Sequence, residues 1–319
     1  MAELPPWFIV AVAVALGLAF GSFLNVVIYR LPRGLNVAHP GSRCPACDTP
    51  IRGYDNIPVV SWLVLRGRAR CCKAPIAVRY PLIETMGGLL AWAIVQMKVL
   101  PLPPDTEFWR WGTLFALYLA VGLGLIAAAF IDLEHLYLPD EITLGGAVLG
   151  LVSVLFREDL DWQQALLGAA LGFVMVWLPF DLLYSRLRGA PGMGLGDAKL
   201  VMLAGAWFGW KGALFALLAG AVQGTLGATA VYLATGVIEE PDAVKAERQA
   251  MQEALANAEG KERAELEREL ARDPIAQEPE PGLAKARLAF GPFLVLACLE
   301  YLLFGDIIVE GYLNWVWQA

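Results

Sequence analysis

The sequence from residue 109 to residue 131 reads Trp109-Arg-Trp-Gly-Thr-Leu-Phe-Ala-Leu-Tyr-Leu-Ala-Val-Gly-Leu-Gly-Leu-Ile-Ala-Ala-Ala-Phe-Ile131, and Asp132 follows it directly. This run is long enough for an α-helix to cross the hydrocarbon core of a bilayer, which takes ~20 apolar residues. Its apolar residues are continuous rather than alternating, which favours a helix over a strand of a membrane barrel. The segment therefore predicts an all-α membrane protein.

Seven other apolar runs predict that the protein is polytopic, with about eight transmembrane helices. The runs are 7–28, 82–99, 142–156, 165–183, 200–210, 213–237 and 288–304. Several of them reach full spanning length only with their flanking residues. The sequence Gly209-Trp-Lys-Gly212 is the only break between two of the runs, so the count depends on whether the chain turns there.

The composition agrees with a membrane protein. Of the 319 residues, 58% are hydrophobic and 17% are charged, against ~45–50% and ~25% in soluble domains. The mean hydropathy is +0.56. These values exclude a disordered chain, a collagen-like chain, a disulfide-rich mini-protein and most soluble enzymes. The formal net charge of -7 argues against a nucleic acid as partner.

The distribution of charge predicts the orientation. Residues 30–80 hold nine Lys or Arg and two acids, so by the positive-inside rule this loop is cytoplasmic and the N-terminus lies outside. The first run has neither a basic flank before it nor a cleavage site after it, which favours an anchor over a removed signal peptide. Counting spans forward places the loops at 132–140 and 186–199 on the cytoplasmic side and the acidic stretch 157–161 outside.

A second polar region covers residues 239–287, with eight basic and thirteen acidic residues. Its pattern predicts two helices that are separated near Gly260, which makes it a charged helical insert. A solvated insert without any chemistry is the alternative interpretation.

Four of the five cysteines, Cys44, Cys47, Cys71 and Cys72, lie in the basic loop. The Cys44-Pro-Ala-Cys47 spacing allows two thiolates to reach one tetrahedral zinc. Cys71 and Cys72 are adjacent, and neighbouring side chains are expected to point apart. We therefore expect a zinc knuckle with Cys44, Cys47 and one or both of the other two, or a loop of reduced thiols without metal. A disulfide is not expected on the cytoplasmic side.

Ionisable residues at membrane depth are expensive and suggest function. The candidates are Glu84, Asp132, Asp181, Asp197 and Glu300. Asp132 and Asp197 both fall at the predicted cytoplasmic ends of spans, so they could meet. Two carboxylates held close together cannot both ionise, which suits acid and base roles in aspartyl protease chemistry. The alternatives are a helix cap for Asp197 and a proton relay in a carrier.

Several ordered motifs then show a resemblance to a known family. Gly194-Leu-Gly-Asp197 resembles the GxGD signature of intramembrane aspartyl proteases, and the whole chain is similar to the bacterial type IV prepilin leader peptidases, also called prepilin peptidase/N-methyltransferases. The matching segments are Gly21-Ser-Phe-Leu-Asn-Val-Val-Ile-Tyr-Arg-Leu-Pro32, Cys44-Pro-Ala-Cys47, Asn56-Ile-Pro-Val-Val-Ser-Trp-Leu63, Arg79-Tyr-Pro-Leu-Ile-Glu84, Ile131-Asp-Leu-Glu-His-Leu-Tyr-Leu-Pro-Asp140, residues 192–200 and Phe290-Gly-Pro-Phe293.

The resemblance implies that Asp132 and Asp197 are catalytic aspartates. It implies a multi-pass protein of the bacterial inner membrane that cuts the leader of prepilins or pseudopilins on the cytoplasmic side. Many members also methylate the new N-terminal amine with S-adenosylmethionine. A proton-coupled carrier and a non-catalytic pilus-assembly scaffold are the competing interpretations, and the expected partners are prepilin precursors and the lipid bilayer.

The resemblance also suggests a division of the chain. We expect a first transmembrane helix (1–29), a basic cytoplasmic loop domain (30–81), a transmembrane protease core (82–237), the charged insert (238–287) and a last transmembrane helix with a tail (288–319).

The chain departs from the family pattern in two places. The family usually has two CxxC pairs, but here Ala69 stands where the third cysteine is expected, and Cys71 is the candidate replacement. The insert is also longer than the family's connection. Glu84 lies in a family motif, and both a salt bridge to Arg79 and a chemical role are open for it.

Overall fold

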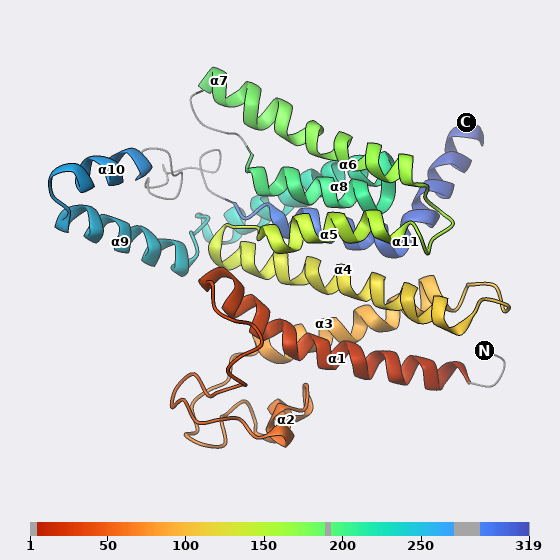
Figure 1. Cartoon of the computed structure of the whole chain (residues 1–319), viewed down its shortest axis with the longest axis horizontal. Helices are drawn as coiled ribbons and strands as arrows, with labels where there is room; N and C mark the ends of the chain where they lie inside the picture. The colour runs from red at the N-terminus through yellow and green to blue at the C-terminus, as the bar shows by residue number, and fades with distance from the viewer. Residues whose placement is uncertain (1–4, 189–192, 271–287, 319) are drawn as a thin grey trace.

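The computed structural model describes residues 5–188, 193–270 and 288–318, and most of these residues are helical (Figure 1). These ranges contain no β-strand; two isolated β-bridges occur in the loop that follows the first helix. The predicted all-α fold class is confirmed.

The helices follow the apolar runs. The long ones are α1 (Pro6–Arg30), α3 (Arg79–Ile94), α4 (Phe108–His135), α5 (Asp140–Ser153), α6 (Trp162–Val176), α8 (Leu195–Thr235) and α11 (Gly291–Gln318). The short helices α2 (Val60–Val64) and α7 (Tyr184–Arg188) lie outside the apolar runs or at their ends. Wider π-helical turns extend α3 over Val95–Val99 and α6 over Trp177–Leu183.

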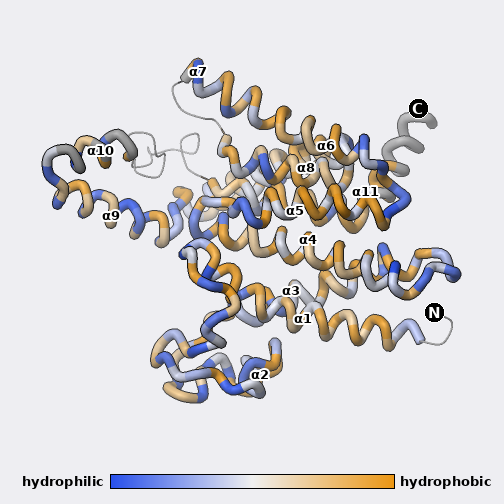
Figure 2. The backbone as a smooth tube through the Cα atoms, in the orientation of Figure 1, coloured by the Kyte–Doolittle hydropathy of each residue, from blue (hydrophilic) through white to orange (hydrophobic). Residues whose placement is uncertain are grey.

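Five stretches of the described residues are long and apolar enough to cross a membrane. They are Pro6–Arg33, Arg79–Val99, Phe108–His135, Trp162–Leu187 and Leu195–Thr235. The helix α5 and the apolar segment Gly291–Gly305 of α11 are shorter than a full span. The chain is therefore a multi-pass membrane protein, as the hydrophobic colour along the bundle in Figure 2 illustrates. The count of eight spans stays a prediction.

The chain reverses direction inside α8, at Gly209. A Cβ on Gly172 of α6 would lie near both the Val201 carbonyl and the Cβ of Ala213, although twelve residues of straight helix would separate those two by ~18 Å. Gly209 has φ 68° and ψ -173°, a conformation that only glycine adopts without strain. The break that the sequence suggested at this position is confirmed, and α8 consists of two antiparallel arms.

Close glycine contacts hold the bundle together. A Cβ on Gly205 would overlap the backbone of Gly168, which joins the first arm of α8 to α6, and Gly17 and Gly87 join α1 to α3 in the same way. Small residues at such crossings let membrane helices pack backbone to backbone, where burial from water provides no driving force. This packing fixes the helix ends that carry the candidate site.

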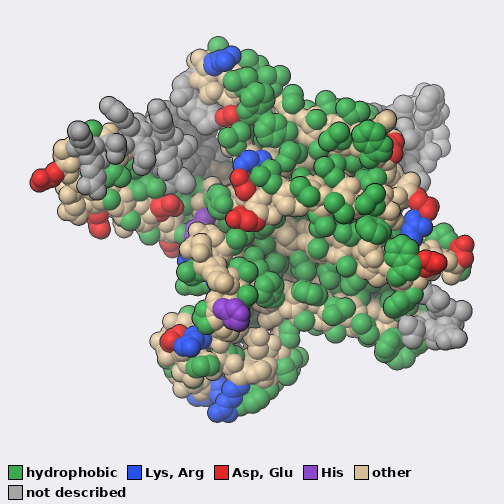
Figure 3. Space-filling view, viewed as in Figure 1, with side chains coloured by type: hydrophobic (Ala, Val, Ile, Leu, Met, Phe, Trp, Pro, Cys, Tyr) green, Lys and Arg blue, Asp and Glu red, His purple; other side chains and the backbone are tan. Residues whose placement is uncertain are grey.

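The bundle has two distinct ends. The C-terminal end of α4 and the N-terminal end of α8 lie together at the left of Figure 1, and we call this the aspartate end because it holds Asp132 and Asp197. The loop over residues 31–78 and the insert also lie there, whereas the loop at 157–161 lies at the opposite, far end. Segments predicted to share one side of the membrane thus lie at one end. Figure 3 shows hydrophobic side chains over the middle of the bundle and most of the charged ones towards its ends.

The insert contains the two predicted helices, α9 (Asp242–Asn257) and α10 (Gly260–Leu270). The helix α9 packs against α4 at the aspartate end. It is anchored by Val244, which is fully buried, and by a buried ion pair in which Arg248 lies 2.5 Å from Glu240. Residues 271–287, the remainder of the predicted insert, lie outside the described residues.

Candidate active site

Asp132 lies near the end of α4, where it is 6% exposed. Its Oδ2 accepts a hydrogen bond of 2.9 Å from the backbone N–H of Gly291, the first residue of α11. A Cβ on Gly291 would lie 2.7 Å from that oxygen and 3.1 Å from Cδ2 of Leu138. The glycine is therefore required by the close approach of α11 to the Asp132 carboxylate.

Asp197 lies in the first turn of α8 and is partly buried. Its Oδ2 accepts a hydrogen bond of 3.3 Å from the N–H of Gly194, the residue that directly precedes the helix. This contact is the capping interaction that the sequence allowed. It occupies one carboxylate oxygen, so it does not exclude a role beside Asp132.

The structure brings the two aspartates to one place. Gly196, next to Asp197, would place a Cβ 3.0 Å from the Cβ of Leu138, and Leu138 is the same buried side chain that Gly291 approaches. The charges of Asp132 and Asp197 also act on each other. The predicted pair is therefore assembled by the end of α4, the start of α8 and the start of α11.

Two ion pairs brace the helix ends around the pair. Lys199 of α8 lies 2.6 Å from Asp140, the first residue of α5. Arg79 at the start of α3 pairs with Glu134 at the end of α4. The carboxylate pair of Asp132 and Asp197 can activate a water and polarise a carbonyl, and it can equally relay a proton.

The four loop cysteines form one cluster. Their sulfur atoms all lie within 4.8 Å of one another, with Cys44 to Cys72 at 3.7 Å, Cys47 to Cys71 at 3.3 Å and Cys71 to Cys72 at 3.9 Å. Four sulfurs around a tetrahedral zinc at ~2.3 Å lie ~3.8 Å apart. The donor set therefore fits zinc. The expectation that the adjacent Cys71 and Cys72 point apart is wrong here, because both reach the cluster.

The same hydrogen-bonded backbone turn occurs twice in the loop, 25 residues apart in the sequence. In the first turn, the Cys44 N–H donates to Thr49 and the Cys44 carbonyl accepts from Asp48, at 2.9 and 2.8 Å. In the second turn, the Ala69 N–H donates to Ala74 and the Ala69 carbonyl accepts from Lys73, at 2.8 and 2.9 Å. Ala69 therefore occupies the place of a cysteine, as the motif alignment predicted, and Cys71 supplies the fourth sulfur.

The thiols of the cluster differ in acidity even without a metal. The hydrogen bond with Thr49 lowers the pKa of Cys47 to about 6, and the hydrogen bond with Cys47 raises the pKa of Cys71 to about 12. The thiolate form is thus favoured at Cys47.

Glu84 does not form the salt bridge that was open for it. Arg79 pairs with Glu134 instead, and Oε2 of Glu84 accepts a hydrogen bond of 2.6 Å from the N–H of Val59 in the loop. Glu84 is 9% exposed, and it ties the cysteine-bearing loop to α3.

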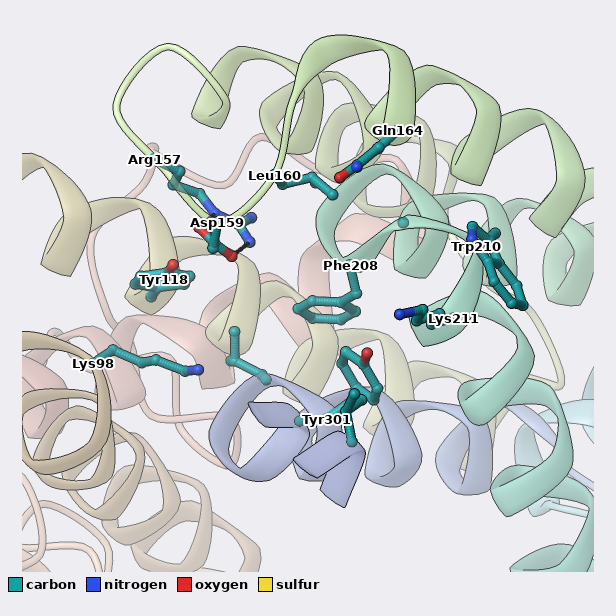
Figure 4. A pocket seen from close by; sticks show the side chains of 14 residues that line it. Lys98, Tyr118, Arg157, Asp159, Leu160, Gln164, Phe208, Trp210, Lys211 and Tyr301 are labelled. Atoms are coloured by element: carbon teal, nitrogen blue, oxygen red, sulfur yellow. Dashed lines mark hydrogen bonds and ion pairs between the residues drawn. The ribbon is translucent and has the colours of Figure 1, made fainter. Parts of the chain in front are cut away.

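A cavity of about 520 Å³ opens at the far end of the bundle (Figure 4). Its lining includes Lys98, Arg157, Asp159, Lys211 and Tyr301. This cavity is distant from the aspartate pair, so the candidate site is formed at helix ends and not in the cavity.

Comparison with known proteins identifies the family. The profile of the Bacterial Peptidase A24 N-terminal domain matches residues 15–98, and that of the Type IV leader peptidase family matches residues 119–229. The chain is also 33% identical to a prepilin leader peptidase/N-methyltransferase of Aeromonas hydrophila, over 97% of this chain and 95% of the relative.

The chain belongs to the type IV leader peptidase family. A relative with the same name from Neisseria gonorrhoeae is 37% identical over 72% of this chain and 84% of its own length, and one from Stutzerimonas stutzeri is 36% identical over 69% and 82%. No solved structure is significantly similar to the chain.

The two matched segments of this leader peptidase divide the candidate residues. Asp132 and Asp197 fall within 119–229, and the cysteine cluster and Glu84 fall within 15–98. Sequence reasoning did not assign roles to Gly291 or Val59. Gly291 stands in the Phe-Gly-Pro-Phe motif, which was the available signal, but only the fold shows that its N–H meets Asp132.

Proposed function

We propose that this protein is an intramembrane aspartyl endopeptidase that removes the leader from type IV prepilin-like precursors. The observation that carries the proposal is that Asp132 and Asp197 lie at one end of the bundle, where the glycines beside both of them, Gly291 and Gly196, approach Leu138. Both aspartates lie in the segment that matches the leader peptidase family, and the relatives named above are prepilin leader peptidases.

The chemistry follows from the pair. One carboxylate takes a proton from the attacking water, and the other, in its protonated form, donates a hydrogen bond to the carbonyl of the scissile peptide bond. The Gly291 N–H holds Asp132 through one oxygen, and Gly194 holds Asp197 through one oxygen. Each carboxylate thus keeps its second oxygen for the reaction.

The charge distribution supports cleavage on the cytoplasmic side of the membrane. The basic loop over 30–80 lies at the aspartate end, which by the positive-inside rule supports a cytoplasmic position for this end. The precursor leader would meet the aspartates there, at the inner face of the bacterial inner membrane.

The cleavage experiment uses the full chain in membrane vesicles with a prepilin substrate. Asp132→Asn and Asp197→Asn should each abolish cleavage, so that the substrate keeps the mass of its leader. Asp140→Asn is the matched control, because Asp140 lies at the same end but in a surface ion pair, and it should still cleave. Cleavage by both pair variants would refute the proposal. Loss of proton-dependent uptake without any change in peptide length would favour a carrier.

We propose a second activity, N-methylation of the new N-terminus with S-adenosylmethionine, on the basis of the relatives' names. When bound, S-adenosylmethionine supplies an electrophilic methyl group. Mass spectrometry of the processed pilin should show one added methyl group when this cofactor is present, and an unmodified amine would leave a protease alone.

We also propose that Cys44, Cys47, Cys71 and Cys72 hold a structural zinc that orders the loop. Purified protein should contain about one zinc per chain, and Cys44→Ser should lose it. Zinc near zero in the unsubstituted protein would refute this site.

A further inference from the structure

Glu84 is a buried carboxylate that the peptidase reaction does not use. Its Oε2 accepts the Val59 N–H at 2.6 Å, and its Oε1 makes no hydrogen bond with any described residue. Val59 is a β-branched residue at φ 61°, a conformation that is disfavoured unless the surroundings enforce it. The contact therefore fixes the Glu84 carboxylate at the junction of the loop and the bundle.

A second polar group with an unmet hydrogen bond lies on the neighbouring helix. Asn25 of α1 is 4% exposed, and its Nδ2 donates to the carbonyls of Gly21 and Tyr80 at 3.4 and 3.3 Å. Its Oδ1 is buried and has no hydrogen-bond partner among the described residues. Buried acceptors in native proteins are nearly always satisfied, so this oxygen indicates a missing donor.

The two groups lie at one helix contact. A Cβ on Gly21 would lie 2.9 Å from Cα of Glu84, so α1 and α3 touch at this level. Asn25 follows Gly21 by one helical turn, and Tyr80, which it bonds, precedes Glu84 by one turn. Asn25 thus offers a buried acceptor without a donor, and Glu84, one turn away, offers a carboxylate oxygen without a hydrogen bond to any described residue. An amine, which carries several donors, can bond both.

The position of this contact favours the amine that cleavage produces. The Arg79–Glu134 ion pair joins the start of α3 to the end of α4, two residues beyond Asp132. Glu84, Asn25 and Val59 all lie in the matched N-terminal segment 15–98, separate from the peptidase segment that contains the aspartates. Polar groups outside the peptidase segment thus lie at the same end of the bundle as the two aspartates.

We propose that Glu84, assisted by Asn25, binds the newly exposed N-terminal amine and accepts its proton during methyl transfer. The inference rests on the proposed function. The amine arrives as an ammonium and gives one proton to Oε1 of Glu84. Its nitrogen lone pair then forms a bond to the methyl carbon of S-adenosylmethionine, the carbon–sulfur bond breaks, and the sulfur keeps the electron pair. The product is a methylammonium, and Glu84 returns its proton to water.

The substitution Glu84→Gln tests the role, because it removes the charge but keeps an oxygen that can accept the Val59 N–H. In vesicles with prepilin and S-adenosylmethionine, we expect leader cleavage within about twofold of the unsubstituted protein and methylation lowered roughly 100-fold or more. Glu84→Asp, which keeps the charge, should restore part of the methylation. Glu300→Gln is the matched control, because Glu300 is bonded to Gln223 elsewhere in the bundle, and both activities should persist.

A binding measurement without S-adenosylmethionine separates amine recognition from turnover. Processed pilin with a free N-terminal amine should bind the unsubstituted protein about tenfold more tightly than Glu84→Gln. Processed pilin with an acetylated N-terminus should bind both equally. Zinc content and thermal unfolding should not change, since the loop contact is retained.

Three results would overturn the inference. They are normal methylation by Glu84→Gln, a parallel loss of cleavage and methylation, and equal binding of free and acetylated pilin by the unsubstituted protein. Failure of the proposed function gives different results: no cleavage at all refutes the peptidase. Cleavage without methylation refutes the second activity, and the binding measurement still decides whether Glu84 recognises the amine.

Discussion

Two sites of buried charge, one at each end of the bundle, differ in the partners that surround them. At the far end, the Arg157 guanidinium bonds both carboxylate oxygens of Asp159 at 3.0 and 2.5 Å and the Trp207 carbonyl at 2.8 Å. It also lies over the rings of Tyr118 and Trp207. At the aspartate end, Asp132 and Asp197 each accept one backbone N–H and form no ion pair with any described residue.

The difference separates stability from chemistry. A buried cation with an anion, a carbonyl and two rings around it is held in one charge state, and it locks the α5–α6 connection to α8. A carboxylate pair with few partners can change its protonation state during a reaction. We therefore expect substitution of Arg157 to change folding and substitution of Asp132 or Asp197 to change catalysis.

The largest expected effect compares Asp197→Asn with Arg157→Met. Asp197→Asn should lower cleavage by about 1000-fold and leave thermal unfolding unchanged. Arg157→Met should lower the free energy of unfolding by roughly 1–3 kcal/mol, mainly because it leaves the carbonyl of the buried Trp207 without its donor, whereas Asp159 is 58% exposed and water can replace its partner. Cleavage assays in vesicles and unfolding in detergent measure the two effects. A loss of cleavage in folded Arg157→Met would break the comparison.

The cysteine cluster extends the comparison, because its four sulfurs also lie at the aspartate end and have the spacing that suits the proposed zinc. Cys71→Ala should weaken zinc binding by more than the ~10–100-fold that loss of an outer-shell partner causes. Adding Ala69→Cys to that variant should restore binding, because Ala69 occupies the place that Cys44 has in the first turn.

Metal titration with a competing chelator measures both cysteine variants. If the double variant binds zinc no better than Cys71→Ala, the two turns are not equivalent. The matched control is Ala74→Ser, which changes none of the four cysteines. Gly34→Ala is unsuitable, because Gly34 has φ 62°, a conformation that an alanine would strain.

A smaller effect is expected from Gly291→Ala, which tests how tightly the aspartate end is packed. The added Cβ would lie 2.7 Å from Oδ2 of Asp132, so the carboxylate must shift. A displacement of this kind should lower kcat by roughly 10–100-fold with less change in KM. Gly145→Ala of α5 is the matched control, because no atom lies within 4 Å of its added Cβ. An unchanged kcat in Gly291→Ala would mean that the rate of cleavage does not depend on the exact position of the Asp132 carboxylate.

Much of this arrangement was predictable because membrane helices are determined by local sequence. The apolar runs predicted the helices, and Gly209 was identified as the break between two of them. The pairing of Asp132 with Asp197 followed from their places at the ends of spans. These features depend on hydropathy and on counting spans, which require no knowledge of helix packing.

The contacts between distant segments were not predictable in the same way. The local sequence does not show that the N–H of Gly291, 159 residues away, donates a hydrogen bond to Asp132. It also does not show that Arg79 pairs with Glu134 and not with Glu84. Cys71 and Cys72 were expected to point apart because they are adjacent, as neighbouring side chains do in an extended chain. The tight turn that begins at Ala69 directs both sulfurs to one cluster instead. Such contacts depend on packing, which hydropathy does not encode.

The smallest expected effect comes from Lys199→Met, and it tests whether partnered charges are structural at the aspartate end as well. Lys199 lies two residues after Asp197 and pairs with Asp140 at 2.6 Å, with side chains 25% and 53% exposed. An ion pair this exposed contributes ~0–1 kcal/mol, and salt screens it. Cleavage should therefore fall by no more than about twofold, and the change should disappear as the salt concentration rises. A much larger loss that persists in high salt would mean that Lys199 acts on the Asp132–Asp197 pair itself, so that charge at this end is tuned by a cation as it is at Arg157.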